Sequence, residues 1–118
     1  MSGHTATRDG ALIAHGSVGD AELEVARKCA WQCARNVAAA AVAELGSLDA
    51  VRQVTRITVY VASAAGFVQQ HLVADAASAY FLEVFGPTAG RHARAAIGVA
   101  SLPTGSPVEV DAIFELAG

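Results

Sequence analysis

Two cysteines, Cys29 and Cys33, have a spacing at which their thiols could act together. They lie four residues apart in a stretch with a helical pattern, so both side chains fall on one helix face. A disulfide between them would constrain almost nothing, and a metal site would need further ligands, which no nearby His or Cys supplies at a useful spacing. We therefore expect both to be small, buried hydrophobic side chains, and we expect no metal site.

Arg94 and Glu109 are a second pair that could act together. Residues 93–102 and 107–115 each have the pattern of a strand, and the Pro, Thr and Gly between them favour a turn. A hairpin with this turn would place both charges on one face, but roughly 20 Å apart along the strands. The two side chains could then share a site only if Arg94 of one subunit met Glu109 of another. The alternative is two solvated charges on an exposed sheet.

The predicted hairpin would have two different faces. Ile97 and Val99 would face the core, while alternation along the strand would turn Arg94, Ala96 and Gly98 to the other face. Small side chains in a row let another backbone approach closely, so we interpret this second face as a subunit interface.

The rest of the chain alternates between helical and extended patterns. Apolar residues recur at steps of three and four from Asp20 to Leu45, which predicts a helix of about 25 residues that stops at Gly46. A run of β-branched residues predicts a strand at 54–62, and a short apolar run predicts an edge strand at 11–14. Recurring apolar residues that end at Gly86 and Pro87 predict a second helix at 67–85. We expect the whole chain, residues 1–118, to form one α+β domain in which two helices cover one side of the sheet.

The composition indicates a single domain with a thin core. Of the 118 residues, 53% are apolar, but 27 residues are alanine, and each methyl group buries little area. Because such a core stabilises the fold weakly, we expect contacts between subunits to add to the stability. An oligomer is therefore expected.

Charge and hydropathy exclude several classes of function. The net charge is −3, the pI is near 5.7, and no stretch carries a cluster of Lys or Arg, so nucleic acid is not the expected partner. The longest apolar stretch, Val37 to Ala43, is far shorter than the ~20 residues that span a bilayer, and the N-terminus lacks a basic region followed by an apolar segment. We expect a cytoplasmic protein without a membrane segment.

The C-terminal part of the chain carries a long motif. It runs from Glu83-Val-Phe-Gly-Pro-Thr-Ala-Gly-Arg-His-Ala-Arg94 through Ala-Ala-Ile-Gly-Val-Ala-Ser-Leu-Pro103 to Pro107-Val-Glu-Val-Asp-Ala-Ile-Phe114. This motif resembles that of the Rid family, the YjgF-type reactive-intermediate deaminases, which are also known as endoribonuclease L-PSP or translation-inhibitor proteins. The resemblance continues upstream and covers roughly residues 18–115.

The resemblance implies a fold like that of the bacterial chorismate mutase, a trimer whose sheets form an inner barrel, with helices outside and ligand clefts between subunits. It also implies that Arg94 binds the carboxylate of a small imino acid, such as the one derived from 2-aminoacrylate. Glu109 would be associated with the water that hydrolyses the C=N bond, since a carboxylate can orient or deprotonate water. No cofactor is implied, because an imine is already electrophilic.

Three further residues would border the cleft of such a protein and contribute to substrate binding. Ser2 falls at the place of a cleft serine in the family, and the strands that precede this serine are absent, so we interpret the chain as an N-terminally shortened member. Asp75 stands where family members carry asparagine, and it would add negative charge beside an anionic substrate. His92 lies two residues before Arg94, on the same face of the strand.

The residues and the resemblance together predict hydrolytic deamination of short-lived enamine and imine intermediates at a cleft between subunits. The ligand would be a small imino or keto acid, and the partners would be further copies of the chain in a homotrimer. A non-catalytic trimeric protein that binds small carboxylates is the alternative. The ribonuclease or translation-inhibitor activity of some relatives is a third interpretation, which the acidic balance of the chain disfavours.

Overall fold

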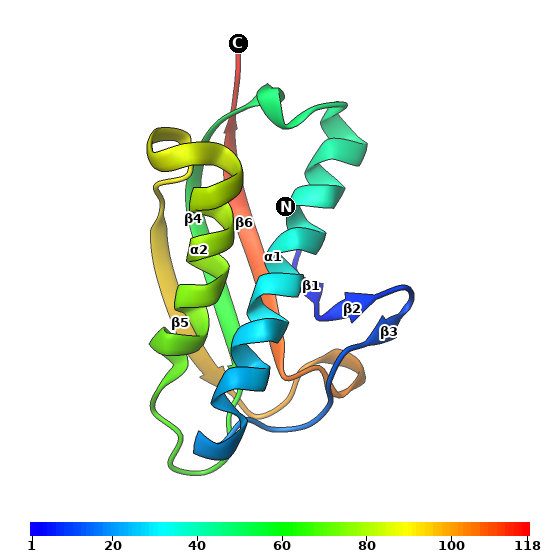
Figure 1. Cartoon of the computed structure of the whole chain (residues 1–118), viewed down its shortest axis with the longest axis vertical. Coiled ribbons are helices and arrows are strands. Elements are labelled where there is room, and N and C mark those ends of the chain that lie inside the picture. The colour runs from blue at the N-terminus through cyan, green and yellow to red at the C-terminus, as the bar shows by residue number, and fades with distance from the viewer.

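A four-stranded sheet with two helices on one of its faces forms the body of the molecule (Figure 1). The computed structural model describes residues 1–118, and its sheet has the strand order β1-β6-β4-β5. These strands are β1 (His4–Thr5), β6 (Val108–Leu116), β4 (Val51–Ala62) and β5 (Ala93–Val99). The expected α+β fold, with two helices covering one side of the sheet, is confirmed.

Both helices end or break at a glycine. Helix α1 (Leu23–Leu45) follows a single 3-10 turn and stops at Gly46, whose φ of 87° is a left-handed conformation that favours glycine. Helix α2 (Gln70–Ala89) is interrupted at Gly86, where φ is 88°, so its last turn is set off from the rest. The two predicted helices are therefore confirmed, and neither has the apolar length needed to cross a membrane.

The predicted hairpin between the last two strands is wrong. β5 pairs with β4 in parallel and β6 pairs with β4 antiparallel, so β4 lies between them. The turn itself does have hairpin-like geometry, since Thr104 and Gly105 have positive φ angles of 58° and 81°. The strand order is decided instead by β4, the longest strand, because a central position pairs its backbone groups on both sides.

The two faces of β5 are reversed relative to the prediction. Arg94, Ala96 and Gly98 lie on the helix-covered face, in register with the buried side chains of β4, whereas Ile97 is 42% exposed on the open face. The small residues serve helix packing, since a Cβ on Gly98 would lie 2.9 Å from Nε2 of Gln70. Arg94, Ala96 and Gly98 therefore lie on the side of α2, but Arg94 and Gly98 stay exposed and Ala96 is half-buried. The interpretation of this face as a subunit interface stays a prediction.

The residues before α1 belong to the domain. β1 pairs with β6, and Ala6 and Val18 are buried in the core, with at most 1% of their surface exposed. The side-chain amide of Asn36 on α1 donates hydrogen bonds to the carbonyl oxygens of Thr5, at 3.0 Å, and Thr7, at 2.8 Å. These bonds fasten the N-terminal segment to the helix.

Two short strands, β2 (Thr7–Arg8) and β3 (Ala11–Leu12), form a separate hairpin beside α1 (Figure 1). The chain reverses at Asp9 and Gly10, which have φ angles of 54° and 83°. The edge strand expected at 11–14 is therefore limited to β3, and it pairs with β2 instead of the main sheet.

The buried face of α1 is made almost entirely of small side chains, which lets the helix lie close to the sheet. Its fully buried members are Ala26, Cys29, Ala30, Cys33, Ala34 and Val37. Burial raises the pKa of the Cys29 thiol to about 11 and raises that of Cys33 as well, so both thiols stay protonated at neutral pH. The interpretation of the two cysteines as small buried side chains is confirmed.

Phe81 on α2 is the largest fully buried side chain, and it joins the helix to the sheet. Its ring centroid lies 6.2 Å from that of Phe85, 6.4 Å from that of Phe114 on β6 and 6.1 Å from that of His92. The same ring therefore supports both the core and the residues just before β5.

We expect Phe81→Ala to lower the free energy of unfolding by about 3–5 kcal/mol, because it leaves a cavity at this junction. Val68→Ala is the control, since Val68 is 75% exposed and its truncation should change stability by less than about 0.5 kcal/mol. Guanidinium unfolding at a fixed protein concentration measures both. Equal losses in the two variants would contradict this description of the core.

Candidate functional site

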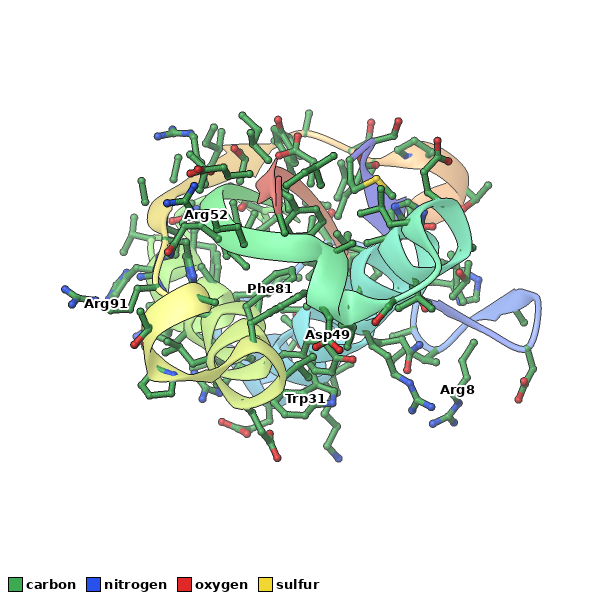
Figure 2. All side chains as sticks on the ribbon, turned by 90° about the horizontal axis from the view of Figure 1, so that it is seen from above. Arg8, Trp31, Asp49, Arg52, Phe81 and Arg91 are labelled. Carbon is green, nitrogen blue, oxygen red and sulfur yellow. The ribbon has the colours of Figure 1, made fainter.

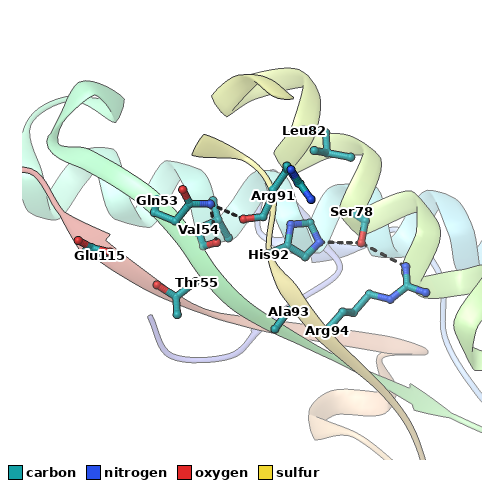
Figure 3. Close-up of a pocket in the computed structure, with 10 residues that line it drawn as sticks. All are labelled: Gln53, Val54, Thr55, Ser78, Leu82, Arg91, His92, Ala93, Arg94 and Glu115. Carbon is teal, nitrogen blue, oxygen red and sulfur yellow. Dashed lines mark hydrogen bonds between the residues drawn. The ribbon is translucent and has the colours of Figure 1, made fainter. Parts of the chain in front are cut away.

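A groove of about 620 Å³ lies along the outer edge of β5, between this strand, α2 and the beginning of β4 (Figure 3). Most of its lining side chains are polar. Ser78 and Leu82 come from α2, and Gln53 comes from β4. Arg94 lies on β5, and His92 is the residue just before this strand. Glu115 from β6 also lines the groove, which thus joins α2 to three strands of the sheet.

Ser78, His92 and Arg94 are connected by hydrogen bonds (Figure 3). The Ser78 hydroxyl lies 2.8 Å from Nε2 of His92 and accepts a hydrogen bond from Nη1 of Arg94 at 3.2 Å. Nδ1 of His92 lies 2.6 Å from the carbonyl oxygen of Gly90, which can only accept, so Nδ1 carries a proton. In the neutral ring, Nε2 then accepts the proton of the Ser78 hydroxyl. The groove therefore contains a hydroxyl directed at a basic nitrogen.

Arg94 is held at only one of its nitrogens. Nη1 donates to Ser78 and to Oδ1 of Asp75, which lies 2.8 Å away and forms an ion pair with it. Nη2 and Nε have no hydrogen-bond partner within the chain, although the side chain is only 28% exposed. The free Nε–Nη2 edge presents two parallel donors, which is the geometry that binds a carboxylate at two points.

The turn that carries His92 is fixed on two sides. The ring of His92 packs edge-on against Phe81. The side-chain amide of Gln53 on β4 donates to the carbonyl oxygens of Thr88 and Arg91, which ties the turn between α2 and β5 to the sheet. The polar groups of the groove are therefore supported by the contact between helix and sheet, and they do not depend on a free loop.

Five residues were singled out in the sequence. Of these, His92 and Arg94 line the groove, and Asp75 lies beside it in an ion pair with Arg94, whereas the other two lie elsewhere. Glu109 lies on β6 and Ser2 lies just before β1, which pairs with β6. The glycine after Ser2 packs so closely on Glu109 that a Cβ there would overlap its carboxylate. Glu109 and the N-terminal segment thus form a second location, across β4 from the groove.

Arg94 and Glu109 point to opposite faces of the sheet. Arg94 is in register with Ile57 of β4, and Glu109 is in register with Tyr60, three residues further along the same strand. An odd offset along a strand reverses the direction of the side chain. The expectation that both charges share a face is wrong, because it assumed that β5 and β6 pair directly. Arg94 and Glu109 do not meet within one chain. This agrees with the sequence analysis, which expected the same separation from their distance along the strands.

Ser78 is the residue of the groove that we missed in the sequence, although a signal for it exists. It lies three residues after Asp75, so the predicted helix already places the two side chains on one face. Gln53 carries no such signal, because its role depends on where β4 lies relative to β5. The structure contains no group of three His, Cys, Asp or Glu side chains spaced to hold a metal ion.

A family model described as Endoribonuclease L-PSP matches residues 1–116. The chain belongs to this family. The resemblance noted from the C-terminal motif is therefore confirmed, and the match extends to the N-terminal residues as well. Protein TCP17 of Trypanosoma cruzi is 50% identical over 91 residues, which are 77% of this chain and 54% of TCP17. The chain thus spans about half the length of this curated relative.

Two solved structures share the fold described above. Protein Atu1372 of Agrobacterium tumefaciens, whose function is unknown, is 42% identical and superimposes with a TM-score of 0.94 over 98% of this chain and 74% of its own. The YjgF gene product of Escherichia coli is 24% identical, with a TM-score of 0.62 over 94% of this chain and 74% of its own. The expected YjgF-type arrangement of helices and sheet is confirmed.

We expect the negative charge of Asp75 to weaken the binding of a carboxylate at Arg94. An asparagine of the same shape would not have this effect. Asp75→Asn keeps an oxygen that can accept from Nη1 but removes the negative charge, so we expect pyruvate to bind about two- to fivefold more tightly. Calorimetric titration with pyruvate measures this effect. Glu83→Gln removes an exposed charge elsewhere on α2 and should leave the affinity unchanged. Equal affinities for the wild type and Asp75→Asn would show that the carboxylate binds elsewhere.

Proposed function

We propose that this protein hydrolyses small 2-imino acids to 2-keto acids and ammonia, in clefts between the subunits of a homotrimer. The observation that carries the proposal is the free edge of Arg94. Asp75 and Ser78 fix this guanidinium through Nη1, and its two remaining donor positions stay available beside the groove. A small carboxylate that binds there would lie on the side of the guanidinium that faces away from Asp75 and Ser78, so its neighbouring carbon would be open to groups from outside this chain.

The chemistry needs few groups. Water adds to the imine carbon to give a carbinolamine, and this intermediate loses ammonia to leave the keto acid. The protein has to hold the carboxylate, position the water and accept its proton. Arg94 performs the first task in this proposal, and Glu109 performs the other two. No cofactor enters the scheme, because the C=N bond is already electrophilic.

Glu109 would be supplied by a neighbouring subunit. Arg94 lies on the outer strand β5, and Glu109 lies on the other side of β4 and on the opposite face, so a contact that joins them uses two different surfaces of the chain. Such a contact is heterologous, and it closes into a ring when the rotation between copies allows it. The exposed Ile97 and Ile113 on the open face of the sheet supply apolar area for this contact. The family resemblance favours a ring of three.

A non-catalytic protein that binds small carboxylates is the second candidate. It is favoured by the position of Glu109, which lies outside the groove that contains Arg94. On this alternative the groove would bind pyruvate and similar acids, and the wild-type protein would release no ammonia from an imino acid.

The direct test is ammonia release from 2-iminopropanoate generated in the assay by an amino-acid oxidase. We expect Arg94→Gln to lower kcat/KM by roughly 10- to 100-fold, because charged hydrogen bonds to the carboxylate are lost. Arg94→Lys is the matched control, because it keeps the positive charge but loses the two-point geometry. Its kcat/KM should lie between those of the wild type and Arg94→Gln. Release by the wild type at the rate of the buffer alone would reject the enzymatic function in favour of a binding protein.

Mixing two impaired variants tests whether the site lies between subunits. If Arg94 and Glu109 come from different copies, then an equal mixture of Arg94→Gln and Glu109→Gln, refolded together, should regain about a quarter of the wild-type rate. The reason is that each side of an interface has about one chance in two of carrying its native residue, independently of the other side. Each variant refolded alone should keep about a tenth of the wild-type rate or less. A mixture no more active than its components would contradict a shared site.

A further inference from the structure

A second cavity, of about 780 Å³, lies on the outer side of α1, between this helix, the β2–β3 hairpin and α2. It shares no lining residue with the groove at β5. Four of its lining side chains are cations: Arg8, Arg27, Lys28 and Arg35. We call this cavity the cationic pocket. Arg8 and Trp31, which also lines it, lie on the same side of the molecule (Figure 2).

The charge of the cationic pocket is unusual for this chain. The whole sequence has eight Lys and Arg residues and a net charge of −3, yet half of its cations line this one cavity. Glu24 is the one acidic residue among them. The sequence showed no such cluster, because Arg8 joins the cations of α1 only when the β2–β3 hairpin folds beside the helix.

None of the four cations has an acidic partner. The structure contains two ion pairs, Arg52 with Glu115 and Arg94 with Asp75, and both lie outside the cationic pocket. Like charges gathered around one cavity repel one another unless an anion lies between them. The pocket therefore has the electrostatic character of a site for a multiply charged anion.

Parts of the cationic pocket are fixed in place. The half-buried Arg27 donates from Nη1 to the carbonyl oxygen of Leu72, which holds its guanidinium between α1 and α2. The N-terminal segment that carries Arg8 is fastened to α1 through Asn36. Two of the cations are thus anchored, directly or through their backbone, before any ligand binds, which lowers the entropy lost on binding.

Trp31 gives the cationic pocket an aromatic wall. Its ring contacts Tyr80 edge-on, with 4.9 Å between the centroids, and the residue is only half-buried. The indole is therefore held in one orientation while part of it faces the cavity. A flat ring stacks on such a surface, and arginine and lysine side chains bind phosphate groups.

We propose that the cationic pocket binds a small phosphorylated molecule that carries a flat ring, of the nucleoside phosphate class. The phosphates would lie among the four cations and the ring against Trp31. The cavity has the size of a small-molecule site, and a net charge of −3 with only four further Lys and Arg residues in the chain disfavours a long nucleic acid. This site is independent of imine hydrolysis at the groove.

Trp31 is the single tryptophan of the chain, so its fluorescence reports directly on this pocket. The protein is titrated with ATP, inorganic pyrophosphate and adenosine, with excitation at the red edge of the indole band, where adenine does not absorb. We expect saturable quenching by ATP, binding of pyrophosphate that is weaker by about tenfold or more, and no saturation by adenosine. An unchanged signal with ATP up to millimolar concentration would overturn the proposal.

Substitutions identify the residues involved. Lys28→Gln and Arg35→Gln should each weaken ATP binding by roughly tenfold, because each removes a charged contact to phosphate. Arg52→Gln is the control, since it removes a cation outside the pocket and should leave the affinity unchanged. Circular dichroism verifies that the variants fold. Equal affinities in all four proteins, or preferential binding of long single-stranded RNA over ATP, would overturn the assignment.

Discussion

Backbone pairing of β4 on both of its sides is the constraint on which the rest of the structure depends. The strand runs from Val51 to Ala62, bonds in parallel to β5 and antiparallel to β6, and turns fully buried Ile57, Val59 and Val61 toward the helices. Helix α2 connects β4 to a parallel neighbour, which requires a crossover over one face of the sheet. This arrangement leaves β5 at the margin, where Arg94 meets α2, and it separates Arg94 from Glu109.

The ion pair at Arg94 combines two opposing effects. Asp75 offsets part of the positive charge that would attract an anion, but together with Ser78 it also holds the guanidinium in one orientation. An arginine without such a partner would lose more side-chain freedom when a carboxylate binds. In the proposed function Asp75 would therefore act as a positioning residue for Arg94, in addition to the negative charge that it places beside the ligand.

Local signals in the sequence predicted the helices well and the strand order poorly. The spacing of apolar residues and Gly46 define α1 without reference to any other element. In contrast, the turn at Thr104 has the dihedral angles of a hairpin but leads across the end of β4, and no local pattern distinguishes these two courses. The same limit applies to the sites. Ser78 follows from its helical spacing to Asp75, whereas the convergence of Arg8 and Arg35 depends on how the hairpin folds against α1.

The sheet has two dissimilar margins. On one side the two-residue β1 covers only a short part of β6, and on the other the seven residues of β5 have backbone groups without a neighbouring strand. An uncovered strand of this length is a template for adding another strand, which proteins commonly discourage with charge or irregularity. Arg94 lies within this strand, and a charged side chain on an edge strand is one of the features that discourage such addition. The charge at this margin thus also acts against uncontrolled growth of the sheet.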